Sequence, residues 1–90
     1  MAKVVLTADV KNGSKWEKAF RTHGDLLKSA GIGHVDYTVD DDHVVMCTDV
    51  ADADAYLKFL KSDETQDAMK GDGVKRKSVK VYVLDRELAG

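Results

Sequence analysis

The chain alternates between stretches with two different hydrophobic periods. In residues 3–10 every second side chain is apolar, which is the period of a strand that buries one face. The same alternation predicts strands over residues 32–39, 43–50 and 78–84. Residues 44–47 are apolar at every position, so the third strand is predicted to be central and covered on both faces.

A helix is predicted between the first two strands, after a break at Asn12-Gly13. Ser14 and Glu17 have the spacing of a capping box, in which the two side chains satisfy backbone N–H groups at a helix start. Gly31 is expected to end the helix, because glycine accepts a positive φ. Apolar and aromatic residues then form one stripe at helical spacing: Trp16, Ala19, Phe20, His23, Leu27 and Ala30.

The segment between the third and fourth strands predicts a second helical region. Asp52 is a candidate N-cap for one helix, and Ser62 is a candidate N-cap for a following turn or short helix. The Gly71-Asp72-Gly73 motif is expected to stop it. The three aspartates at 40–42 predict a solvated turn between the second and third strands.

The resulting order, β-α-β-β-α-β, predicts one α+β domain over residues 1–90 with the ferredoxin-like arrangement. Right-handed crossovers place both helices on one face of a four-stranded antiparallel sheet. The other face is expected to carry an apolar set formed by Val5, Val45, Cys47, Tyr82 and Leu84. Exposed apolar faces of this kind mark interaction surfaces, so we expect a homodimer in which two sheets pack face to face.

Composition narrows the range of partners. The chain is 43% hydrophobic and 33% charged, with a net charge of −2 that is spread evenly. No broad positive field attracts nucleic acid or an anionic membrane, so neither is an expected partner. With a single cysteine, no disulfide within the chain is possible, and no apolar stretch approaches the length of a membrane span. These features favour a cytoplasmic protein.

His23 is the candidate catalytic residue, because it lies on the aromatic stripe one turn from Phe20. An imidazole in a pocket lined by Trp16, Phe20 and Tyr37 could act as a general base or bind a substrate hydroxyl. The alternative is a histidine at the edge of the stripe that bonds to backbone or water.

The other polar clusters favour structural interpretations. His34 and Asp36 share a strand face, as do His43 and Cys47, but no spacing supplies a convincing third metal ligand, so we expect no metal and no cofactor. Cys47 lies in an apolar strand, where a structural role is the more usual one. The basic run 75–77 is expected to be a solvated loop.

Four segments resemble the dimeric α+β barrel superfamily, which includes the antibiotic-biosynthesis-type monooxygenases. They are a first strand leading into a Trp-containing helix (VLTADV…KWEKAF), a Gly-terminated link (SAGIGHVDY), an Asp-initiated helix with a Ser-acid turn (DVADADAYLKFLKSDETQDAM) and a closing strand (SVKVYVLDR). The resemblance implies a homodimer and a pocket between the helices and the sheet of each subunit. Haem-degrading relatives place a His and a Trp in that pocket, and the second helix here has neither.

Two functions are therefore carried forward. The first is a homodimeric domain that binds a small aromatic or apolar molecule, with a cofactor-independent monooxygenase-like reaction as the activity that the resemblance implies. The second is a non-enzymatic structural or regulatory dimer with a filled interior. A cavity of roughly 300 Å³ or more, the usual lower size of a ligand site, would count against the second. The residues alone do not decide whether the protein is an enzyme.

Overall fold

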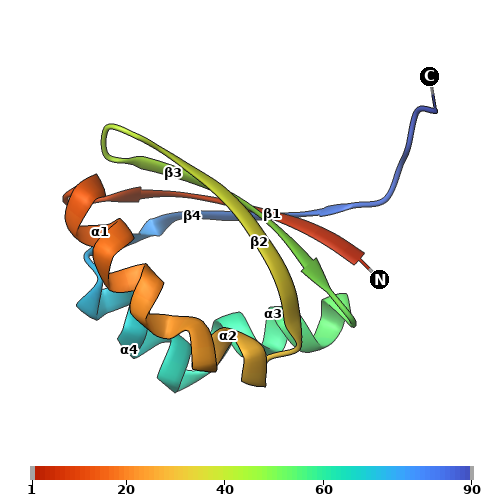
Figure 1. Ribbon diagram of the computed structural model, residues 1–90, viewed down its shortest axis with the longest axis horizontal. Coiled ribbons are helices and arrows are strands. Elements are labelled where there is room, and N and C mark those ends of the chain that lie inside the picture. Colours follow the sequence, from red (N-terminus) through yellow and green to blue (C-terminus); the bar gives the residue numbers. More distant parts are fainter. Residues whose placement is uncertain (1, 90) are drawn as a thin grey trace.

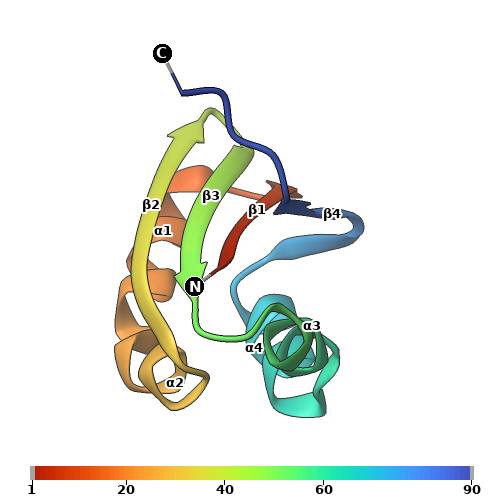
Figure 2. The same cartoon turned by 90° about the vertical axis from the view of Figure 1, so that its right-hand side faces the viewer.

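Residues 2–89 form a four-stranded sheet with all the helices on one side, in the computed structural model that describes them (Figures 1 and 2). The elements in chain order are β1 (Ala2–Val10), α1 (Gly13–Phe20), the 3-10 turn η1 (Arg21–His23), α2 (Gly24–Ser29), β2 (Ile32–Asp40), β3 (His43–Val50), α3 (Ala53–Lys61), α4 (Asp63–Gly71) and β4 (Val74–Leu84). None of these helices is long and apolar enough to cross a membrane.

The strands follow the order β2-β3-β1-β4, and all neighbours are antiparallel. This is the arrangement that two βαβ crossovers produce, and it confirms the predicted ferredoxin-like fold. β3 and β1 occupy the centre of the sheet, as the apolar run in residues 44–47 predicts, but the helices cover only one face of β3 and not both.

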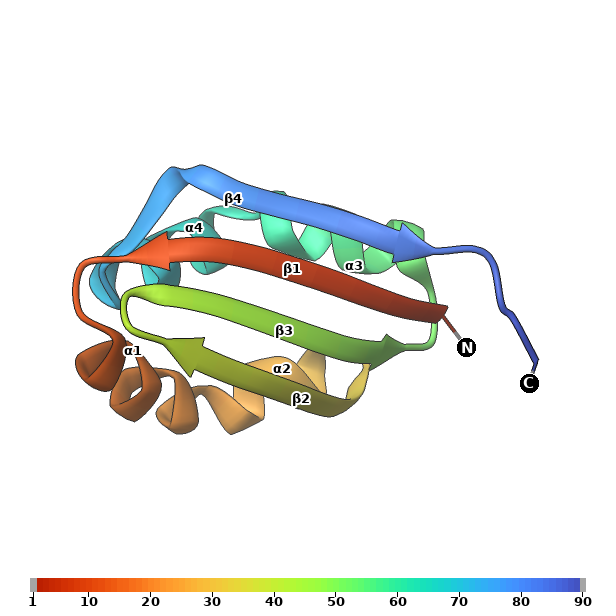
Figure 3. The same ribbon diagram turned by 90° about the horizontal axis from the view of Figure 1, so that it is seen from above.

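The register of the strands places the predicted apolar set on one face. Val5 lies opposite Cys47 on β3 and Tyr82 on β4. Val45 and Leu84 are two residues further along those strands, and side chains two residues apart share a face. No helix covers this face, which we call the open face (Figure 3). Tyr82 and Leu84 are 51% and 50% exposed there.

The other face of the sheet holds the core, in two clusters. One gathers around the middle and N-terminal end of β1 with α3, and the other around the C-terminal end of β1 with α1. Their fully buried members include Val4, Val10, Val44 and Val50. The first helical arm, α1-η1-α2, lies under β2, and the second arm, α3-α4, lies under β1 and β4 (Figure 2).

The first helical arm differs from the single helix predicted from its stripe. The α-helix stops at Phe20, continues as the 3-10 turn η1, and resumes at Gly24. The predicted capping box is also wrong, because Asn12 is the N-cap and its Oδ1 accepts from the N–H of Lys15 at 3.0 Å. Asn is as good an N-cap as Ser, and it comes two residues earlier.

The helix start packs tightly against the turn between β2 and β3. A Cβ at Gly13 would overlap the carbonyl oxygen of Asp41, so only glycine fits this approach. Asp41 itself has a φ of 56°. The Gly13 N–H donates to Asp42 Oδ1 at 3.3 Å, which ties the turn to α1.

The predicted caps of the second arm are confirmed. The Asp52 side chain accepts from the N–H groups of Asp54 and Ala55, and the Ser62 hydroxyl accepts from the Thr65 N–H. The expected helix ends are also present, because Gly31 and Gly73 both have positive φ values, 76° and 81°.

The last strand begins four residues earlier than predicted, so the basic run 75–77 belongs to β4 and is not a loop. The pairing with β1 shifts register there: Thr7 faces Lys80, and Asp9 faces Lys75. A bulge therefore separates a short basic section from the regular strand. The alternation of apolar and polar residues did not reveal this section, because Lys75, Arg76 and Lys77 are all charged and therefore show no alternation.

Candidate functional site

An apolar cavity lies between the two helical arms and the sheet. Its volume is about 80 Å³. Leu6, Ala8, Val44 and Met46 supply side chains from the sheet, and residues of α1, η1 and α2 close one side. The second arm closes the other side with Phe59, Leu60, Ala68 and Met69. The interior is almost wholly hydrocarbon.

Three of the four residues predicted to line a pocket lie on this wall. Trp16 and Phe20 are one helical turn apart on α1, and their rings stack with centroids 4.8 Å apart and an interplanar angle of 11°. His23 follows on η1 and also lines the cavity. The 3-10 geometry tightens the chain at this point, and it sets the direction in which His23 leaves the backbone.

Tyr37 lies outside the cavity, contrary to the prediction. Its ring contacts Trp16 and Phe20 edge-on, at centroid distances of 5.8 and 5.6 Å, so it supports the aromatic wall from behind. Its hydroxyl donates to Glu17 Oε2 at 2.7 Å. That hydrogen bond lowers the pKa of the Glu17 carboxyl and raises the pKa of the Tyr37 phenol.

His23 has a partner that sequence reasoning missed. Its Nε2 lies 3.0 and 3.2 Å from the two carboxylate oxygens of Asp72, the residue that follows α4. The side chains are 28% and 12% exposed, so the contact is partly shielded from water. Both residues line the cavity. Asp72 is 49 positions away in the chain, and its Gly-Asp-Gly context indicates only a helix end.

The contact favours one tautomer of the neutral imidazole. An ionised carboxylate can only accept hydrogen bonds, so Nε2 carries the hydrogen and Nδ1 holds the lone pair when the ring is neutral. A carboxylate that orients a histidine in this way is the arrangement used to support a general base. Within residues 2–89, His23–Asp72 is also the only side-chain hydrogen bond that links the first helical arm to the end of the second.

Two further polar residues of the second arm face the cavity. Tyr56 is 2% exposed, and its burial raises the pKa of the phenol, so it stays protonated over a wide pH range. Thr65 is 5% exposed, and its hydroxyl is bonded to Ser62 Oγ at 2.9 Å.

The remaining histidines lie on the open face and contact one aspartate each. His34 Nε2 is 2.9 Å from Asp36 Oδ1, and His43 Nδ1 is 2.8 Å from Asp9 Oδ1. The first pair is strongly exposed, with side-chain exposures of 64% and 77%. Among residues 2–89, no three His, Cys, Asp or Glu side chains come together in a way that could hold a metal ion.

Comparison with solved structures identifies proteins that share this fold. No family model and no curated protein matches the sequence. Solved structures do match: a Bordetella bronchiseptica protein classed with the antibiotic biosynthesis monooxygenases has a TM-score of 0.75 at 17% identity, covering 97% of both chains. SnoaB, a cofactor-independent oxygenase from Streptomyces nogalater, has a TM-score of 0.72 at 13% identity, covering 98% of this chain and 94% of its own.

A third similar structure was solved with a bound ligand. It is the monooxygenase ActVA-Orf6 from Streptomyces coelicolor in complex with nanaomycin D, with a TM-score of 0.66 at 17% identity over 98% of this chain and 88% of that one. The chain therefore has the α+β fold of the antibiotic biosynthesis monooxygenase structures, over nearly its full length. The resemblance seen in the sequence is confirmed for the fold, and at these identities the fold is all that the likeness establishes.

Proposed function

We propose that this protein is a homodimeric domain that binds a small aromatic or apolar molecule in the cavity between its helices and its sheet. The observation that carries the proposal is the His23–Asp72 pair in the wall of a largely hydrocarbon cavity. A mostly apolar pocket with a few convergent polar groups is the usual form of a small-molecule site. The ligand of ActVA-Orf6, nanaomycin D, is consistent with an aromatic occupant.

The reaction that fits this site is a monooxygenation without a cofactor. His23 Nδ1 would accept the proton of a phenol-type hydroxyl, with Asp72 stabilising the imidazolium that forms. The phenolate gives up electrons to O₂ more readily than the phenol does. A substrate CH₂ group next to the ring would then become a carbonyl: one oxygen atom enters the carbon, and the other leaves as water with the two hydrogens.

The size of the cavity sets a condition on this proposal. About 80 Å³ is room for a few water molecules, whereas ligand sites usually span about 300–1,000 Å³. An aromatic ligand therefore enters only if the two helical arms move apart. The break in the first arm at η1 and Gly24 gives that arm a point at which it can bend.

The small cavity also supports the second candidate, a non-enzymatic dimeric module with a filled interior. The volume is well below the lower limit expected for a ligand site. The two candidates differ in a direct way, because only the first predicts saturable binding of an aromatic molecule that depends on His23.

The decisive experiment combines binding with chemistry. Native mass spectrometry of freshly purified protein, repeated after denaturation, detects any ligand that copurifies as mass lost on unfolding. Oxygen uptake with hydroxylated aromatic compounds is then compared between the natural protein and His23→Ala. The exposed histidine variant His34→Ala is the matched control. Loss of uptake and binding in His23→Ala alone is expected, and unchanged uptake and binding in that variant would refute the catalytic role.

The open face supports the homodimer part of the proposal. Its apolar set would be buried if two sheets packed face to face, as in the dimeric barrels that the sequence resembles. Tyr82→Glu places a charge on this face and is expected to convert a dimer to a monomer. Val83→Glu, the next residue on β4, is 42% exposed on the opposite side of the strand and serves as the control. A natural protein that sedimented as a monomer would overturn the dimer.

A further inference from the structure

A second hollow lies on the outer side of the α3-α4 arm, against the free edge of β4. Its volume is about 630 Å³, well within the range of small-molecule sites. We call it the edge groove. Three of its residues, Leu60, Met69 and Val79, also line the inner cavity, so these side chains form a common wall between the two hollows. Leu57 and Val81 extend the apolar lining toward the surface.

Three cations surround this apolar surface. Lys61 comes from the end of α3, and Arg76 and Lys77 come from the basic section of β4. None of the groove residues is acidic, and Gln66 is the only other polar one. Within residues 2–89, none of the three cations forms an ion pair with a carboxylate. The groove therefore combines a hydrocarbon floor with an unneutralised positive rim.

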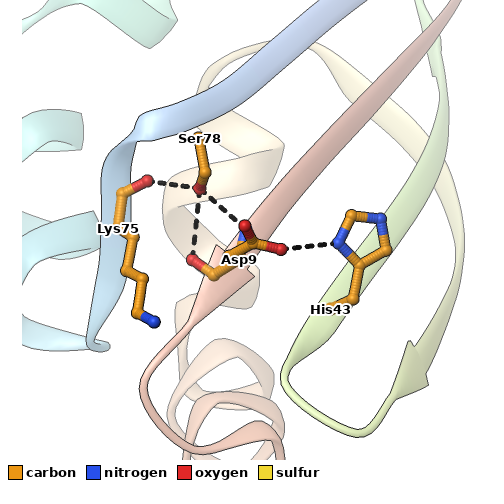
Figure 4. A network of polar contacts seen from close by, with 4 residues as sticks. All are labelled: Asp9, His43, Lys75 and Ser78. Carbon is orange, nitrogen blue, oxygen red and sulfur yellow. Dashed lines mark hydrogen bonds and ion pairs between the residues drawn. The ribbon is translucent and has the colours of Figure 1, made fainter.

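The bulge in β4 is what builds this rim. At the bulge, the Ser78 side chain bonds to backbone groups that the regular strand pairing leaves free. Its Oγ accepts from the Asp9 N–H at 2.8 Å and donates toward the carbonyl oxygen of Lys75 (Figure 4). The section that carries Arg76 and Lys77 is thus held in a defined place next to β1, although it has left the regular register. Asp9 is itself bonded to His43 across the sheet.

We propose that the edge groove binds an amphipathic anion, a molecule with an apolar chain and a carboxylate head of the fatty-acid type. The chain would lie along Leu57, Met69 and Val81, and the head would meet Arg76 and Lys77, where two cations favour one anionic group. Nucleotides fit less well, because no aromatic side chain lines the groove to stack on a base. The proposal is independent of any chemistry at His23.

The test uses dodecanoate, kept below the concentration at which it forms micelles. Isothermal titration calorimetry measures affinity, and two-dimensional NMR of ¹⁵N-labelled protein locates the site. We expect saturable binding with amide shifts in residues 57–61 and 76–81. Dodecan-1-ol and dodecyltrimethylammonium carry the same chain without the negative charge, and both are expected to bind about tenfold more weakly or not at all.

Variants separate the charge from the apolar floor. Reversing both cations in Arg76→Glu/Lys77→Glu is expected to weaken dodecanoate binding about tenfold, a loss of about 1.4 kcal/mol. Lys15→Glu/Lys18→Glu reverses two exposed cations on α1 and is the matched control, with no expected change. All these side chains are exposed, so the variants are expected to fold, which circular dichroism checks.

Several outcomes would overturn the proposal. Equal affinity for dodecan-1-ol would show that the cations take no part. Full-strength binding in the doubly reversed variant would show the same for Arg76 and Lys77. Amide shifts confined to Trp16, Phe20 and His23 would assign the fatty acid to the inner cavity. A lack of saturable heat with dodecanoate would remove this ligand class.

Discussion

Two buried threonines, of which Thr65 lines the cavity, offer a test of how the core is packed. Thr48 on β3 is 1% exposed, and its Oγ1 has no hydrogen-bond partner among residues 2–89. Thr65 on α4 is 5% exposed, and its Oγ1 is bonded to Ser62 Oγ at 2.9 Å. Replacing each with valine exchanges a hydroxyl for a methyl group of similar shape, so the two variants differ mainly in the hydrogen bond that is lost.

The expected changes in stability have opposite signs. An unsatisfied buried hydroxyl costs about 1–3 kcal/mol, and Thr48→Val removes that cost in a strand, where valine is favoured. We expect a gain of about 1 kcal/mol. Thr65→Val loses a hydrogen bond with a net value of about 0.5–1.5 kcal/mol and weakens the start of α4, so we expect a loss of about 1 kcal/mol. The two variants should therefore differ by about 2 kcal/mol.

Urea denaturation followed by tryptophan fluorescence measures this difference, because Trp16 is buried in the core. Each variant is compared with the natural protein at one protein concentration, since dimerisation would add to the apparent stability. A loss of 1 kcal/mol or more in Thr48→Val would refute the reasoning and show that its hydroxyl has a partner. Tyr56 is the candidate partner, because burial raises the pKa of its phenol and the Thr48 side chain offsets part of that rise. The double variant Thr48→Val/Tyr56→Phe would then reveal the coupling.

Three other changes test separate contacts. Gly13→Ala is expected to lose about 1–3 kcal/mol in urea denaturation, because its Cβ meets a backbone carbonyl, whereas Gly33→Ala has open space and should change little. Asp72→Ala is expected to lose about 1–2 kcal/mol and to speed amide exchange in α4, and unchanged exchange would show that the contact does not hold the arms together. The pKa of Glu17 is lowered on folding, so its contribution is present above its ordinary value of 4.5 and is lost as the pH falls through the lowered value. Tyr37→Phe should therefore cost more stability at pH 7 than at pH values below that range, and a deficit that is independent of pH would contradict this origin.

The predictions that the structure confirms rest on local information. Alternation over residues 43–50, the caps at Asp52 and Ser62, and the glycine that ends the first arm each depend on fewer than ten neighbouring residues. The order of elements then limits the topology, because βαβ crossovers are almost always right-handed. The alternation also indicated which side chains share the open face, because a slip of one residue would move every side chain of a strand to the other face, but the exact register of the pairing was not predicted.

The features that were missed depend on distant parts of the chain. Asn12 caps α1 in place of Ser14, so the helix begins at Gly13. This places Gly13 against the turn between β2 and β3. Tyr37 has the aromatic character of a pocket residue, but its hydroxyl is bonded to Glu17 outside the cavity. Asp72 reaches His23 only because the chain between them folds through two strands and three helices. No pattern of neighbouring residues contains that contact.

In the proposed function, the place of the His23–Asp72 pair links ligand entry to chemistry. The cavity must grow several-fold to hold an aromatic molecule, and the pair joins the two arms that would have to separate. A hydrogen bond from a ligand hydroxyl to His23 Nδ1 would offset part of the free energy needed to separate the two helical arms, provided that the bond between His23 Nε2 and Asp72 is kept. If the pair breaks on opening, His23 loses the carboxylate that would stabilise its protonated form, and the site keeps binding without catalysis. The variant Asp72→Ala therefore distinguishes a binding domain from an enzyme. If the variant binds the ligand more weakly, the pair serves mainly to bind. If it binds more tightly because the arms are looser, while oxygen uptake falls, the pair serves catalysis.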